Sequence, residues 1–142
     1  MKRKLFIYAI LMMAMGLHGC NSADQREQLL SEVNEVHDEA MEKMGTLVKL
    51  QKQLTQVADS LRSDSLNDNS ARVDQVEVII AELRAADENM MDWMHHHSET
   101  LSTPMSEEEE MTFLQNEKET MQEVKAQMEA AIAKAEQQLE DI

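Results

Sequence analysis

The sequence predicts an all-α fold, arranged as an up-down-up three-helix bundle with coiled-coil-like seams. Beyond the first 19 residues the chain retains one glycine (Gly45) and one proline (Pro104), and turns depend on these residue types. Apolar residues recur there at alternating spacings of three and four, the periodicity of an amphipathic helix. About 120 residues suffice for one modest hydrophobic core.

The first 20 residues have the features of an export signal. A basic stretch, KRK, precedes the apolar run 5–17, which is too short for a membrane-spanning helix. The run ends in "LHGC", which resembles the lipobox of bacterial lipoproteins, with His18 in place of the usual small or hydroxyl residue. The resemblance implies a cleaved signal peptide over residues 1–19 and lipid attachment at Cys20. The alternative is a free thiol after an ordinary signal peptide.

The residues around the cysteine set the expected location and domain boundaries. By analogy with well-studied lipoproteins, an aspartate after the cysteine would indicate the inner membrane; Asn21 stands there. We therefore expect an outer-membrane lipoprotein of the cell envelope, facing either the periplasm or the outside. Residues 20–25 are expected to form the lipidated cysteine and tether, and residues 26–142 the helical bundle domain. Each buried methylene of a lipid chain contributes about 0.8 kcal/mol, so several chains make a stable anchor.

The charge of the chain excludes one class of partner. Without the signal segment, ten basic residues stand against 28 acidic residues, a net charge of −18. Such a surface repels phosphates, so nucleic-acid binding is not expected. It suits cations or basic partners. The single cysteine leaves no disulfide to stabilise the domain.

The first helix is predicted between the tether and the polar stretch "RSDSLNDNS" at residues 62–70. Its apolar stripe has two polar interruptions and follows a heptad pattern. Val36, Met41, Val48 and Val57 widen it into the stripe of a bundle helix. The stripe consists of Leu30, Val33, His37, Ala40, Met44, Leu47, Gln51, Leu54, Ala58 and Leu61.

The second and third helices flank the stretch "SETLSTP" at residues 98–104. The pattern "SEEE" at residues 106–109 predicts a capping box at the start of the third helix, and its acidic run suits the helix dipole. The second stripe is Val73, Val76, Ile80, Leu83, Asp87, Met90, Met94 and His97. The third stripe is Leu114, Met121, Val124, Met128, Ile132, Ala135 and Leu139.

The stretch "MMDWMHHH" at residues 90–97 is expected at the bundle end nearest the anchor. Counting outward from the loops places Met41 level with Met111, and Met44 level with Leu114. We expect Met90 and Met94 in the core against Met41, Met44 and Met111. Trp93 would cover the flank of the seam, Met91 would lie nearer the edge, and His95 and His96 would face solvent. Gly45 would give room for Met90, Met94 or Trp93 to approach the backbone.

The same stretch leaves a metal site open as an alternative. Thioether and imidazole groups suit Cu(I), and several of these residues have spacings that share a helix face. Methionine is equally a flexible filler of bundle cores, in which case no cofactor is bound. The candidate copper ligands are His37, Met41, Met44, Met90, Met94 and His97.

No enzyme class fits the sequence, and no catalytic residue is predicted. A ferritin-like di-iron site needs Glu-x-x-His motifs, and neither these nor His-Glu-x-x-His occur in the chain. A nucleophile with backbone oxyanion donors needs a strained turn, for which the chain has almost no glycine.

Two motifs, "HDEAMEKMG" (37–45) and "ADENMMDWMH" (86–95), resemble a family of short helical bacterial lipoproteins often labelled "viral A-type inclusion protein". The resemblance spans most of the chain after the signal and implies a helical, membrane-tethered protein, but no activity. The expected function is that of a non-enzymatic structural or interaction lipoprotein. Its partners would be the membrane, through the lipid anchor, and either another protein or a second copy. An envelope copper-binding protein is the alternative.

Overall fold

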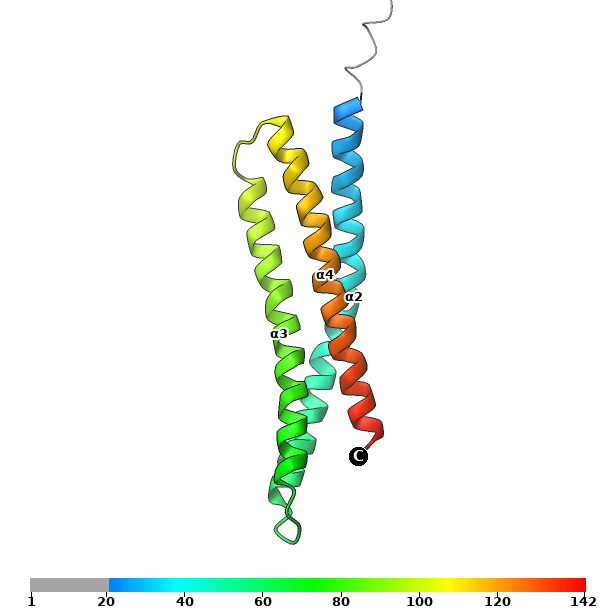
Figure 1. Cartoon of the computed structure of the whole chain (residues 1–142), viewed down its shortest axis with the longest axis vertical. Helices are drawn as coiled ribbons and strands as arrows, with labels where there is room; N and C mark the ends of the chain where they lie inside the picture. Colours follow the sequence, from blue (N-terminus) through cyan, green and yellow to red (C-terminus); the bar gives the residue numbers. More distant parts are fainter. Residues whose placement is uncertain (1–20) are drawn as a thin grey trace, which may run out of the picture.

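The computed structural model describes residues 21–142 and confirms an all-α bundle of three helices (Figure 1). Helix α2 spans Asn21–Ser63, α3 spans Ser70–Leu101 and α4 spans Glu107–Glu140. Helix α3 returns beside α2, and α4 then runs in the same direction as α2 (Figure 1). None of the helices in residues 21–142 combines the length and apolar character needed to cross a bilayer.

The start of α2 differs from the expected boundary. Residues 21–25, assigned to a tether, are the first turns of the helix. The signal segment and Cys20 lie outside the described residues, so the lipobox prediction is not tested by the structure.

The core is a continuous aliphatic column along the bundle axis. The apolar stripes of the three helices meet there. On α2 half of the predicted stripe is buried, namely Val33, Ala40, Leu47, Leu54 and Ala58, together with Leu50, which was not predicted. The other predicted positions of α2 are half-buried. On α3 the buried side follows Ala86 and Trp93 rather than Asp87 and Met94, which are half-buried. The fully buried large side chains are Val33, Leu47, Leu54, Val76, Leu83, Met90, Leu114, Met121 and Met128.

Side-chain hydrogen bonds stabilise the start of α4 and the loop between α2 and α3. Ser106 and Glu109 form the predicted capping box of α4. In the α2–α3 loop, the Asp64 carboxylate accepts hydrogen bonds from the Asn67 side chain and the Leu66 backbone N–H. These donors, with the Asn67 side chain first, hold the pKa of Asp64 below its ordinary value. The two loops span residues 64–69 and 102–106, and the first of them is held by these hydrogen bonds.

The alignment of α4 against the other helices differs from the alignment that loop counting predicted. Arg26 pairs with Glu110 at 2.5 Å, and Lys43 pairs with Glu129 at 3.2 Å. Met111 therefore lies level with the first turns of α2, and Leu114 lies nowhere near Met44. The physical reason is that α4 is shifted along its axis relative to α3. Asn89 lies twelve residues before the end of α3, yet it hydrogen-bonds to Gln127, which lies twenty residues after the start of α4. The first turns of α4 project past α3 and pack along α2.

Candidate functional site

The methionines and histidines of the predicted cluster separate into buried and exposed groups. Met90 is fully buried in the core, and Met44 and Met94 are half-buried against it. Met41, expected in the core, is 39 % exposed. Met91 is exposed, as expected, and so are His95 and His96.

Four rings form a stacked column across the three helices, which we call the ring column. Its members, in order, are His37 of α2, Trp93 and His97 of α3, and Phe113 of α4. Ring centroids are 5.6 Å apart for His37–Trp93, 4.7 Å for Trp93–His97 and 5.6 Å for His97–Phe113. Trp93 is thus a core residue and not the flanking cover that the sequence suggested. Its Nε1 is buried without a hydrogen-bond partner among the described residues.

The ring column is joined to a buried carboxylate on α4. His97 Nδ1 lies 2.6 Å from Oε2 of Glu117, and the two side chains are only 13 % and 7 % exposed. Removal of either partner would leave a buried polar group unpaired, at a cost of about 1–3 kcal/mol.

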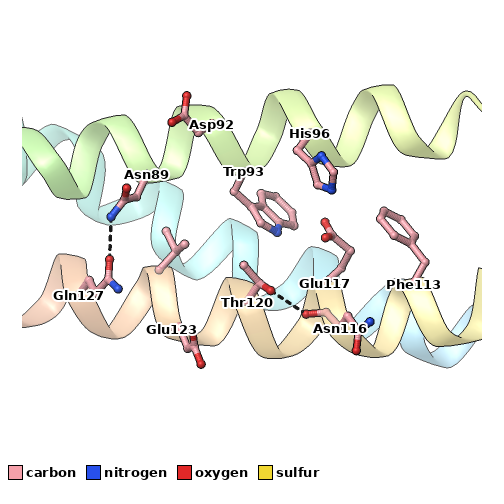
Figure 2. A pocket seen from close by; sticks show the side chains of 11 residues that line it. Asn89, Asp92, Trp93, His96, Phe113, Asn116, Glu117, Thr120, Glu123 and Gln127 are labelled. Carbon is pink, nitrogen blue, oxygen red and sulfur yellow. Dashed lines mark hydrogen bonds between the residues drawn. The ribbon is translucent and has the colours of Figure 1, made fainter.

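A groove of about 590 Å³ opens between α3 and α4 beside this pair. Figure 2 shows Trp93, Glu117 and Phe113 pointing between the two helices, whereas Asp92 and Glu123 point away from it. Asn89 Nδ2 donates to Gln127 Oε1 at 2.8 Å and bridges the groove at one end (Figure 2). The groove is walled by aromatic rings and amides, and its central carboxylate is already engaged by His97.

The one hydroxyl that lines the groove, on Thr120, donates to the backbone carbonyl of Asn116 at 2.9 Å. Within residues 21–142, no group of three His, Cys, Asp or Glu side chains is placed to hold a metal ion. Of the proposed ligands, His37 and His97 stack against Trp93, and Met41 lies at the surface.

Glu117 is the residue of this region that the sequence analysis missed. A signal for it existed in the third stripe, where Leu114 and Met121 are seven residues apart with no apolar residue between them at helical spacing. Position 117 fills that gap at i+3, so a buried acid there was predictable from periodicity. Its partner His97 was already in the second stripe.

Comparison with protein-family models, curated proteins and solved structures finds no match to this chain.

Proposed function

We propose that this protein is a non-enzymatic interaction lipoprotein of the bacterial cell envelope, anchored through Cys20 to the outer membrane. The observation that carries the proposal is the start of α2 at Asn21, the residue after the lipobox-like cysteine. A lipid on Cys20 would place a continuous helix of 43 residues, about 65 Å long, directly at the membrane. The resemblance to short helical lipoproteins points the same way.

The arrangement of the helices sets which end of the bundle would face the membrane. The start of α2 and the α3–α4 turn lie at one end, joined by the Arg26–Glu110 ion pair (Figure 1). The α2–α3 loop lies at the other end and would project away from the bilayer. The domain would then act as a stalk whose long sides are open to partners.

Fractionation of cells that express the full chain or its Cys20→Ser variant tests the anchor. We expect the wild-type chain in the membrane fraction, with a mass that includes the lipid. The variant should be released from membranes or accumulate uncleaved. A variant that is cleaved normally and stays in the membrane fraction would contradict the proposal.

A further inference from the structure

The three seams of the bundle are bordered differently. The α2–α4 seam is bordered by four ion pairs along its length, Arg26–Glu110, Glu32–Lys118, Glu39–Lys125 and Lys43–Glu129. The α3–α4 seam is bordered by two amide hydrogen bonds, Gln75–Gln138 and Asn89–Gln127, and by the ion pair Glu82–Lys134. The α2–α3 seam has the ion pair Arg62–Glu77, at the end next to the loop 64–69.

Farther from this ion pair, the residues that border the α2–α3 seam are apolar. Steps of seven residues return to the same helix face. On α2 they lead from Arg62 to Val48 and Met41, and on α3 from Glu77 to Met91. Because the helices are antiparallel, the steps on both helices lead away from the ion pair toward the same end of the bundle, where His37 stacks on Trp93.

Three large apolar side chains of this border are exposed to solvent. Val48 is 54 % exposed, Met91 53 % and Met41 39 %. The half-buried Met44 and Met94 lie three residues from Met41 and Met91 and connect the border to the core. We call this set the methionine face; it consists of Met41, Met44, Val48, Met91 and Met94.

Gly45 lies beside the methionine face on α2, and no side chain of the described protein packs against it. It is four residues after Met41 and three before Val48, and a Cβ added to it would meet nothing within 4 Å. The expectation that Met90, Met94 or Trp93 approaches its backbone is therefore wrong. Glycine in a helix costs about 1 kcal/mol against alanine. What it offers here is bare backbone on the outer surface, which lets another chain approach closely.

The charges beside the Met41 and Met91 part of the methionine face are acidic. Asp38 and Glu42 are exposed there on α2, and Glu88 is exposed there on α3. Lys49, next to Val48, lies with Lys52 and Arg84 toward the Arg62–Glu77 end. With a net charge of −18 after the signal segment, a second copy would be repelled, whereas a basic partner would be attracted.

We propose that the methionine face is a docking surface for a basic amphipathic helix of a partner protein. This inference rests on the proposed interaction role and adds to it a surface and a partner chemistry. Apolar side chains of the partner, one helical turn apart, would pack on the flexible methionines. Its lysine or arginine side chains would reach Asp38, Glu42 and Glu88.

The test measures binding of a fluorescent synthetic helix of about five turns to the purified full chain. One peptide has an apolar face and lysines on the other face. A second has glutamates in place of the lysines, and a third has the lysine peptide's composition in scrambled order. We expect saturable binding of the first peptide alone. The variant Met41→Ser/Val48→Ser/Met91→Ser should weaken that binding by about tenfold or more.

A matched control replaces exposed apolar residues outside the methionine face. The variant Leu66→Ser/Val78→Ser/Ile142→Ser removes side chains that are 91 %, 59 % and 49 % exposed and should bind like the wild type. Circular dichroism checks that both variants stay helical. Equal binding by the two triple variants, or binding of the scrambled peptide, would overturn the proposal. Self-association abolished by the methionine-face variant would overturn it in favour of a second copy. The assay does not require the lipid, so its failure is separate from a failure of the Cys20 test.

Discussion

At the scale of single residues, the His97–Glu117 pair lies where periodicity calls for apolar side chains. A buried hydrogen-bonded pair of polar side chains contributes little net stability compared with an apolar replacement, because both groups lose their hydration. Breaking the pair from one side is costly, since the remaining group stays buried without its partner. The stacking of His97 between Trp93 and Phe113 fixes the ring that the carboxylate contacts.

Substitutions at this pair should therefore be strongly non-additive. We expect Glu117→Met to lower the free energy of unfolding by about 2–3 kcal/mol, and His97→Leu to lower it as well. The double variant Glu117→Met/His97→Leu should recover to within about 1 kcal/mol of the wild type. Urea unfolding of the four proteins gives the coupling energy, and purely additive losses would show that the pair does not act as a unit.

Gly45 permits a stabilising substitution. We expect Gly45→Ala to raise the free energy of unfolding by about 0.5–1 kcal/mol, because alanine restricts the unfolded chain and meets no atom in the folded one. The reverse change at an exposed helical site, Ala126→Gly on α4, should lower it by a similar amount. Denaturant midpoints measure both, and a loss of stability in Gly45→Ala would mean that the backbone there has a contact in the folded protein.

At the scale of elements, the sequence predicted what depends on local signals. The polar stretches at 62–70 and 98–104 located both loops, and the Ser106 motif located the start of α4 because capping is a property of four adjacent residues. On α3 the sequence predicted Asp87 and Met94 on the buried side, whereas Ala86 and Trp93, one position earlier in each case, are buried. The rotation of a helix about its axis depends on the helices that pack against it. The stagger of α4 along α2 was missed entirely, because pairs such as Arg26–Glu110 form between distant segments. The prediction that Met41 lies level with Met111 is wrong for the same reason.

The α4 capping box should give the helix start a pH dependence. The backbone N–H of Ser106, followed by its hydroxyl, lowers the pKa of Glu109 from its ordinary value of 4.5. A lowered folded-state pKa means that this contribution to stability is fully present above pH 4.5. It is lost as the pH falls through the lower, folded value. The stability difference between wild type and Glu109→Gln should therefore shrink below pH 4.5 in urea unfolding series. A difference that stays constant to lower pH would contradict the assignment.

At the scale of the whole molecule, the distribution of charge sets how the bundle responds to salt. Six of the ten basic residues after the signal segment form ion pairs that border the seams, on Arg26, Lys43, Arg62, Lys118, Lys125 and Lys134. Exposed pairs of this kind contribute about 0–1 kcal/mol each and weaken as salt rises. Against them stands the mutual repulsion of 18 excess negative charges, which extends over the entire surface.

Screening should relieve the repulsion more than it weakens the pairs. The Debye length falls from about 30 Å at 0.01 M to about 8 Å at 0.15 M, so long-range repulsion is removed while contacts below 4 Å are kept in part. We expect the melting temperature to rise by about 5 °C over this range, equivalent to about 1 kcal/mol. A variant with three exposed carboxylates replaced by amides, Glu35→Gln/Glu42→Gln/Glu136→Gln, should melt higher at low salt and respond less to added salt. Thermal unfolding in sodium chloride measures both effects, and sucrose provides a control for solute exclusion without screening. A melting temperature that falls with salt would mean that the ion pairs outweigh the net charge in holding the three helices together.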